Sequence, residues 1–272
     1  MFLYEDQFSE KKDFPMVSKP SKVLIIASTA RCGSHMLGHA LYETNKFGFP
    51  LEYAQPTNLE EWKRRFGCDD IISVMEELMR RRTSPNGVFG IKIHYTHLEQ
   101  FGGFENLVKL FPDAYYVLLN REDVLEQAVS LSIASQTGVW ISGQKPIKED
   151  PVYDFSHIDK CLKDTIINNS LWRYTLAGSG CRYIDMSFEK IRGNLPHAIK
   201  EISSFIDIEI SNDELPKEQA TIKQSNQRNV EWAAKFSADF DKSKNIFNVS
   251  NTDKFNKIKR TIKKLIRIKY LR

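Results

Sequence analysis

The fold is decided by Lys22–Leu41, "KVLIIASTARCGSHMLGHAL". An apolar run rich in β-branched residues leads into the polar turn Ser28–Ser34, after which helix-forming residues resume. This order predicts a buried strand, a tight turn and a helix whose first N–H groups point back into the turn. Such turns bind phosphate groups. The Lys-Ser/Thr ending of a nucleotide triphosphatase P-loop is missing, however, because Ser34 and His35 stand there.

Strand-like and helix-like patterns alternate along the rest of the chain. Buried strands are predicted at Lys22–Ala27, Val88–His94, Ala114–Asn120 and Cys181–Asp185. Helices are predicted at Ser34–Tyr42, Asp70–Arg82, Leu98–Leu110, Val124–Gln136, His157–Leu176, Pro196–Ile206 and Gln227–Phe240. Because strands alternate with helices, we expect an α/β fold with an open parallel sheet flanked by helices. One domain over residues 1–243, with the first ~20 residues as an extension, and a basic tail over 244–272 are predicted.

In an open parallel sheet, ligands bind at the carboxyl ends of the strands. Polar residues follow three of the predicted strands at this edge, at Ser28–Ser34, His94–His97 and Asn120–Arg121. Gln127 and Ser130 come one helix later. We therefore expect these side chains to converge on one site.

Composition indicates a soluble globular protein. The 272 residues are 41% hydrophobic and 27% charged. No apolar run reaches the ~18 residues that span a bilayer, and the acidic start of the chain does not resemble a signal peptide. The four scattered cysteines, without a C-x-x-C pair, favour free thiols in a reducing cytoplasm.

The positive charge is concentrated at the carboxyl end. Residues 254–272 hold nine Lys and Arg and no acid, and removing these nine from the total of 39 leaves 30 basic against 35 acidic residues. A body of net charge −5 argues against nucleic acid as a partner. Apolar residues recur in the tail at helical spacing, at Phe255, Ile258, Ile262, Leu265 and Ile266. The tail is therefore expected either to contact the inner face of an anionic membrane or an acidic partner, or to pack its apolar stripe on the domain.

Six short motifs occur in an order that resembles a known family. They are "STARCGSHML", "GFPLEY", "PNGVFGIKI", "NREDVLEQAVSL", "QTGVW" and "KQSNQRNVEW". The chain resembles the bacterial carbohydrate sulfotransferases of the trehalose 2-sulfotransferase type, which are related to lipopolysaccharide and nodulation-factor sulfotransferases. The likeness runs from about Val23 to Phe240. It implies a P-loop-like fold, 3'-phosphoadenosine 5'-phosphosulfate (PAPS) as sulfuryl donor and adenosine 3',5'-diphosphate as product.

The resemblance also implies roles for individual residues. Arg31, Gly33 and Ser34 match the loop around the donor's 5'-phosphosulfate, Arg121 and Ser130 match the pair that binds its 3'-phosphate, and a late segment folds over the nucleotide. The complete set of expected donor-binding residues is Arg31, Cys32, Gly33, Ser34, His35, Arg121, Ser130, Gln224, Arg228 and Trp232.

For catalysis, the resemblance assigns the general base to Glu52, which would accept the proton of the acceptor hydroxyl. Arg31 would stabilise the leaving oxygen, and His35 is kept as a proton donor. No metal is expected, because a sulfuryl group carries less negative charge than a phosphoryl group and needs no Mg²⁺ clamp. The pairs His35/His39 and His94/His97 lack an evident third ligand for zinc.

Three departures from the family leave alternatives open. Cys32 and His35 stand where relatives commonly have Ser and Thr, and Phe49 replaces an acidic residue of the trehalose enzymes. The acceptor is therefore expected to be a carbohydrate or glycolipid other than trehalose, and homodimerisation is a further expectation from relatives. A kinase is disfavoured by the missing Lys-Ser/Thr. A non-catalytic nucleotide-binding or scaffold protein with this fold remains the alternative from another class.

Overall fold

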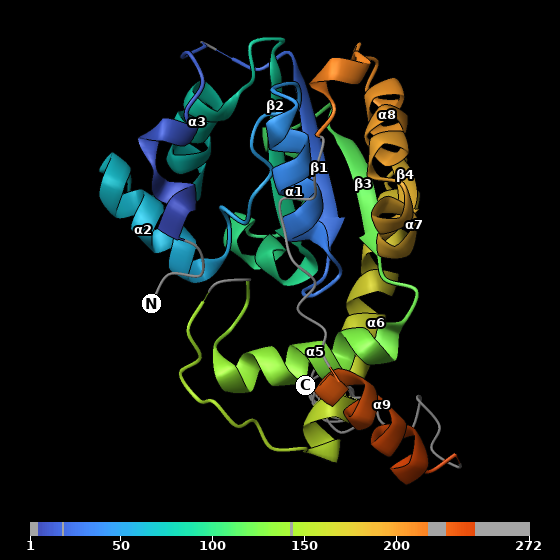
Figure 1. Cartoon of the computed structure of the whole chain (residues 1–272). Helices are drawn as coiled ribbons and strands as arrows, with labels where there is room; N and C mark the ends of the chain where they lie inside the picture. Colours follow the sequence, from blue (N-terminus) through green and yellow to red (C-terminus); the bar gives the residue numbers. More distant parts are fainter. Residues whose placement is uncertain (1–4, 18, 142–143, 217–226, 243–272) are drawn as a thin grey trace, which may run out of the picture. The chain divides into compact units, whose positions relative to one another are not determined.

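A computed structural model describes residues 5–17, 19–141, 144–216 and 227–242 (Figure 1). Its centre is a sheet of β1 (Lys22–Ser28), β2 (Val88–His94), β3 (Tyr115–Asn120) and β4 (Arg182–Ser187). The strands are ordered β2-β1-β3-β4, and every neighbouring pair is parallel. The predicted α/β fold with an open parallel sheet is therefore confirmed, and all four strands lie close to their predicted positions.

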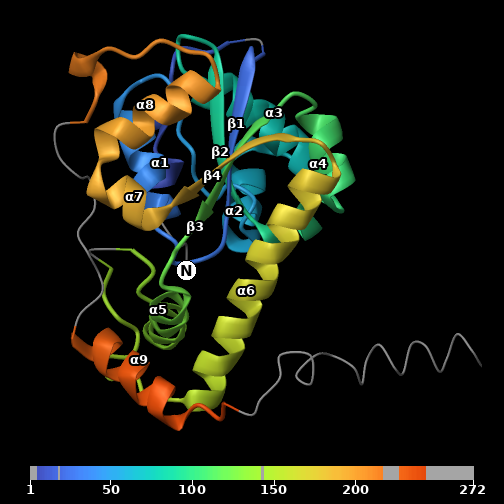
Figure 2. The ribbon, with the colours of Figure 1, turned by 90° about the vertical axis from the view of Figure 1, so that its right-hand side faces the viewer.

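Helices cover both faces of this sheet (Figure 2). Leu24 and Ile26 of β1 pack with α1 (Ser34–Glu43), α7 (Phe188–Gly193) and α8 (Leu195–Phe205). Ile25 and Ala27 face the opposite cluster, because side chains alternate along a strand. That second cluster draws on α2 (Pro56–Phe66), α3 (Ile71–Arg82), η3 (Tyr95–Phe101), α4 (Phe104–Leu110) and α6 (Phe155–Gly178). The continuous apolar run of β1 is explained by burial on both faces.

The helices differ from the prediction in three places, one of which is the short helix α7, which was not predicted. The helix expected over 98–110 is divided into η3 and α4, because Gly102 and Gly103 have φ angles of 73° and 114° that a continuous helix does not allow. Sequence periodicity also missed α2, which begins with Pro56 in its first turn and the side chain of Gln55 as cap. Proline at this position is compatible with a helix because the first N–H groups need no intrahelical partner.

The first residues, which the sequence suggested as an extension of the domain, make buried contacts with it. Arg82, with a 1% exposed side chain, donates to the carbonyls of Gln7 and Ser9, at 2.9 and 3.1 Å, and its Nε lies 2.8 Å from Asp13. The ring of Phe8 packs on Trp62, with 4.8 Å between centroids. A buried arginine needs these acceptors, and the N-terminal segment supplies them.

The chain divides into two compact units, Met1–Ala233 and Ala234–Arg272. The sheet and the helices named above belong to the first, as does α5 (Val124–Thr137), and α9 (Gln227–Asp239) begins in it. The boundary predicted at residue 243 and the tail over 244–272 stay predictions, because the tail lies outside the described residues. Within the described residues, no helix is both long and apolar enough to cross a bilayer.

Candidate active site

The loop between β1 and α1 turns sharply through two residues in the left-handed region. Arg31 has φ 66° and Gly33, the N-cap of α1, has φ 84°. A Cβ atom at Gly33 would lie 2.1 Å from the ring of Phe188, so the position also lacks room for a side chain. Glycine is thus required here for both conformation and space. The loop with its following helix N-terminus forms the P-loop-like turn that the sequence predicted.

Side chains from α5 and α6 form hydrogen bonds with this loop. Gln127 donates to the Thr29 hydroxyl at 3.0 Å and to the Ala30 carbonyl at 2.7 Å. Trp172 Nε1 donates to the Ser28 carbonyl at 3.1 Å. Both side chains are buried, so these bonds exclude water and fix the loop backbone relative to the sheet.

The structure brings two of the residues assigned to the donor, Arg31 and Ser130, into direct contact. Arg31 donates from Nε to the Ser130 hydroxyl at 3.0 Å and from its terminal nitrogen to the Trp140 carbonyl. Burial and the nearby positive charge of Arg121 lower the pKa of Arg31 to about 10, which still leaves it charged at neutral pH. The Arg31 guanidinium on the Ser130 hydroxyl, with the charge of Arg121 near enough to act on Arg31, forms a site that favours an anion with several oxygens.

In the described structure, the guanidinium of Arg121 pairs with carboxylates, and the Arg121 side chain is 11% exposed. It donates to Glu126 at the start of α5, and its Nε lies 3.9 Å from Glu189. This Nε is buried without a hydrogen-bond partner in the described residues. The ring of Phe188 lies under the guanidinium, 5.5 Å from its carbon. Its surroundings thus fix the orientation of the Arg121 guanidinium, but not all of its N–H donors have hydrogen-bond acceptors.

Glu52 is placed by an extra strand-like pairing at the edge of the sheet. Leu51 pairs with Ile91 as an isolated parallel bridge, and its carbonyl accepts from the Lys92 N–H at 3.0 Å. The Glu52 carboxylate consequently lies 2.7 Å from the Lys92 ammonium, whose side chain is 2% exposed. A buried lysine requires an anion, and Glu52 provides it.

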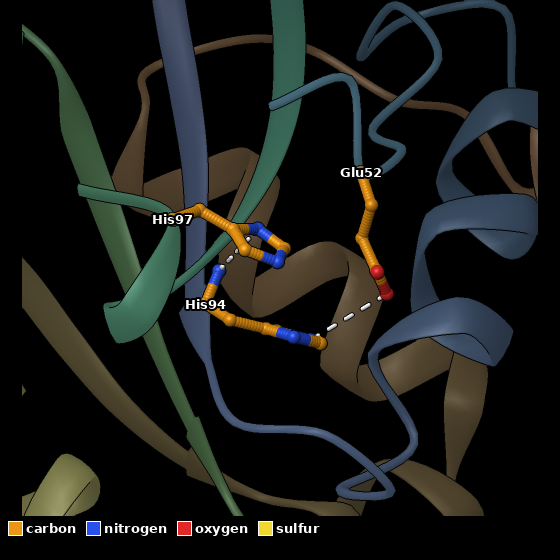
Figure 3. Close-up of side chains that lie close together, drawn as sticks. All are labelled: Glu52, His94 and His97. Carbon is orange, nitrogen blue, oxygen red and sulfur yellow. Dashed lines mark hydrogen bonds and ion pairs between the residues drawn. The ribbon is translucent and has the colours of Figure 1, made fainter. Parts of the chain in front are cut away.

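Two histidines complete this cluster, which we call the Glu52 cluster and define as Glu52, Lys92, His94 and His97 (Figure 3 shows all but Lys92). His94 Nε2 lies 3.5 Å from Glu52, and His97 Nδ1 accepts from the His94 backbone N–H at 3.3 Å. Candidate ligand atoms of Glu52, His94 and His97 all lie within 4.8 Å of one another. Glu52 is therefore the third group near the histidine pair that the sequence did not identify.

The charges of the cluster follow from its burial. Burial alone would raise the pKa of Glu52, but Lys92, His94 and His97 together lower it well below its usual range. Burial lowers the pKa of His94 as well, and lowers that of His97 to about 3. At neutral pH the cluster therefore contains a carboxylate and two neutral imidazoles.

His35 lies at the start of α1 and is also neutral. Burial, then the charge of Lys92, lower its pKa to about 2, and its ring lies 4.5 Å from that of His39. Its ring can offer an N–H to a developing oxyanion, whereas a protonated imidazolium there is disfavoured. Cys32 is fully buried, and this burial raises the pKa of its thiol.

The late segment lies against a different part of the chain. Arg228 is 3.5 Å from Asp150, and the ring of Trp232 meets that of Tyr153 edge-on at 5.8 Å. Among the described contacts, neither residue reaches the loop after β1, and Gln224 lies outside the described residues. Their roles in donor binding stay predictions.

Phe49, the departure from the trehalose enzymes, is fully buried. The centroid of its ring lies 4.2 Å from that of Tyr42, with the two rings tilted, and 5.3 Å from that of His39, which it meets edge-on. The side chain points into the core and offers no surface to an acceptor. The substitution therefore changes the packing beneath the Glu52 segment, and it does not by itself argue against trehalose.

Sequence reasoning missed two residues of the site. Lys92 was read as part of a buried strand, although a lysine within the apolar run "VFGIKIH" already signals a buried charge that needs a partner. Glu126 resembles any acidic residue in the first turn of a helix, where carboxylates are common. Only the structure shows that its partner is Arg121.

Comparison with known proteins assigns the chain to the sulfotransferases. The sequence profile of the Stf0 sulphotransferase family matches residues 23–239, and the chain belongs to this family. The chain is 25% identical over 262 residues to a trehalose 2-sulfotransferase of Mycobacterium tuberculosis (strain ATCC 35801 / TMC 107 / Erdman), covering 82% of this chain and 97% of that protein. The predicted resemblance is therefore confirmed.

Solved structures of low sequence identity were also found. A sulfotransferase from Alicyclobacillus acidocaldarius aligns with a TM-score of 0.49 at 14% identity, covering 82% of this chain and 93% of that chain. A sulfotransferase domain from the curacin biosynthetic pathway aligns with a TM-score of 0.43 at 14% identity, covering 78% and 83%.

Proposed function

We propose that this sulfotransferase moves a sulfuryl group from PAPS to a hydroxyl of a carbohydrate or glycolipid. The observation that carries the donor is the hydrogen bond of Arg31 to Ser130 beside the loop after β1, with the charge of Arg121 near enough to lower the pKa of Arg31. A hydroxyl and two arginines suit a nucleotide that bears a 3'-phosphate in addition to its 5'-phosphosulfate. The relative that sulfates trehalose supports a carbohydrate acceptor.

Calorimetry with non-reactive nucleotides tests the donor. The protein should bind adenosine 3',5'-diphosphate far more tightly than ADP, and Arg121→Ala should remove about 1.5–3 kcal/mol of that binding, as for a charged hydrogen bond. Equal affinity of the wild-type protein for the two nucleotides would exclude a 3'-phosphorylated donor.

The acceptor hydroxyl requires a proton acceptor, and the Glu52 cluster supplies two. Glu52 is the family's candidate, but the Lys92 ammonium makes it a weaker base. His94 is neutral and its Nε2 is buried without a hydrogen-bond partner in the described residues, so it is the second candidate. In either case the other residue of the pair, His94 or Glu52, stabilises the base in its protonated form.

In the transfer step, the sulfur–oxygen bond to the nucleotide breaks as the acceptor oxygen bonds to sulfur. The charge on the leaving oxygen is stabilised by Arg31 and the loop N–H groups.

Three variants distinguish the two bases. If Glu52 is the base, Glu52→Gln slows transfer by about 10²–10⁴-fold while donor affinity is kept. Lys92→Met then shifts the acidic limb of the pH–rate profile to higher pH, because the cation no longer lowers the pKa of Glu52. If His94→Asn causes the large loss and Glu52→Gln only a small one, His94 is the base.

We propose no role for a metal in this reaction. Glu52, His94 and His97 have the residue types and proximity of a zinc site. The Lys92 ammonium already contacts Glu52 at 2.7 Å, and its charge opposes a cation at the same carboxylate. Activity that survives extensive chelation is the expected result, and loss restored by added zinc would contradict it.

A further inference from the structure

We propose that Glu126 is a stand-in anion that holds Arg121 in the nucleotide-free enzyme and must release it when a 3'-phosphate binds. This inference rests on the proposed donor. It concerns the end of β3 and the first turn of α5, which lie next to each other in the chain (Figure 1). Its consequence is that Glu126 limits the affinity for 3'-phosphorylated nucleotides.

The first step in the argument is the charge on Arg121. The Arg121 side chain is 11% exposed, and a cation this buried requires an acceptor at all times. Glu126 accepts a hydrogen bond from a terminal nitrogen, while Glu189 approaches Nε only to 3.9 Å. Glu126 is therefore the main acceptor in the described structure.

The second step is that the guanidinium retains unused donor capacity. Arg121 Nε is buried and makes no hydrogen bond among the described residues, although Phe188 fixes the plane of the group from below. Arginine presents five N–H donors in a rigid fork that matches a phosphate. One carboxylate does not satisfy this fork, whereas a phosphate with three terminal oxygens can do so.

The third step is charge balance. Glu126 and Glu189 offset the two arginines of the site, so a doubly charged phosphate would enter a region that is already neutral. The Glu126 side chain is 29% exposed and can turn toward solvent, which would remove a like charge from the phosphate. Rebinding of Glu126 to Arg121 would then favour departure of adenosine 3',5'-diphosphate, the product that an enzyme must release before its next turnover.

Glu126→Gln tests this role with little change of shape, since the amide oxygen still accepts from Arg121. Calorimetry with adenosine 3',5'-diphosphate should show an affinity about 5- to 50-fold tighter than wild type, as expected for removing a nearby like charge. Affinity for adenosine 5'-monophosphate, which lacks the 3'-phosphate, should not change. The gain should shrink at high salt, because ions screen partly exposed charges.

Glu122→Gln is the matched control. Glu122 lies on the same rim, but its carboxylate accepts from the Ser187 hydroxyl and makes no described contact with Arg121. It removes the same formal charge, so its effect on adenosine 3',5'-diphosphate should be much smaller than that of Glu126→Gln. Equal gains in the two variants would show a general surface effect and overturn the proposal.

The outcomes separate this inference from the proposed donor. Wild-type protein that does not prefer adenosine 3',5'-diphosphate over adenosine 5'-monophosphate would contradict the donor itself. If wild type shows the preference but Glu126→Gln leaves it unchanged or weakens it, the donor stands and the stand-in role is wrong. Thermal unfolding of each variant shows whether a weakened affinity comes from a damaged fold.

Discussion

His97 makes the stability of the folded protein depend on pH. Its pKa is lowered from 6.5 to about 3 by burial, and that of His35 is lowered to about 2. Between these values and 6.5, the unfolded chain binds protons that the folded protein does not. The free energy of unfolding therefore rises with pH in this window and falls as the pH drops below about 6.5.

His97→Gln should weaken this dependence. One imidazole with a pKa near 3 contributes a loss of about 2 kcal/mol between pH 7 and pH 5, and glutamine does not titrate. Its amide oxygen can still accept from the His94 N–H. Denaturant unfolding of wild type and variant at pH 7 and pH 5 measures the difference. Identical losses in the two proteins would show that His97 is not the buried neutral group described here.

At the residue scale, sequence patterns locate single groups better than their partners. The positions of Arg31, Arg121 and Ser130 followed from motif matches, and in the structure Arg31 donates a hydrogen bond to Ser130. The Lys92–Glu52 pair joins two segments that are far apart in sequence. No local pattern reports which buried cation meets which carboxylate, because that depends on the register of the Leu51 bridge with β2.

The turn between β1 and α1 is the element on which the site depends, and Gly33→Ala tests it. Alanine is strained at this φ of 84°, and its Cβ would clash with the Phe188 ring at 2.1 Å. We expect a loss of more than about 2 kcal/mol in unfolding free energy, together with weaker nucleotide binding.

Gly67→Ala is the matched control for backbone strain. Gly67 has φ 65° but nothing within 4 Å of a built Cβ, so this variant should lose only about 1 kcal/mol. Phe188→Ala should partly restore the stability of Gly33→Ala by making room. If both glycine variants lose the same amount, the contact with Phe188 does not constrain the loop.

At the element scale, strands were easier to predict than helices. Buried parallel strands are short apolar runs that stand out from their surroundings, as β1 to β3 do. The interruption at Gly102–Gly103 and the short helix α2 depend on backbone angles and capping, which hydrophobic periodicity does not record. The contacts of the N-terminal segment with Arg82 are long-range, so no local pattern reports them.

At the scale of the whole molecule, we propose that the basic tail can place the protein on an anionic membrane surface. If it lies on an anionic membrane surface, each basic residue near that surface contributes about 1 kcal/mol. Intact protein should then sediment with anionic vesicles at low salt, and a version ending at Asp253 should not. Retention of both versions in the supernatant would favour a tail that packs its apolar stripe on the domain.

The central claim is that the protein transfers a sulfuryl group from PAPS to a carbohydrate hydroxyl, and product analysis tests it most directly. Purified protein is incubated with isotope-labelled PAPS and fractions of cellular carbohydrates and glycolipids, and the products are examined by mass spectrometry. The account predicts a product heavier by one labelled sulfuryl group, formed by wild-type protein and strongly reduced with Arg121→Ala. Tight binding of adenosine 3',5'-diphosphate without any labelled product from these fractions would contradict the claim and favour a non-catalytic nucleotide-binding protein.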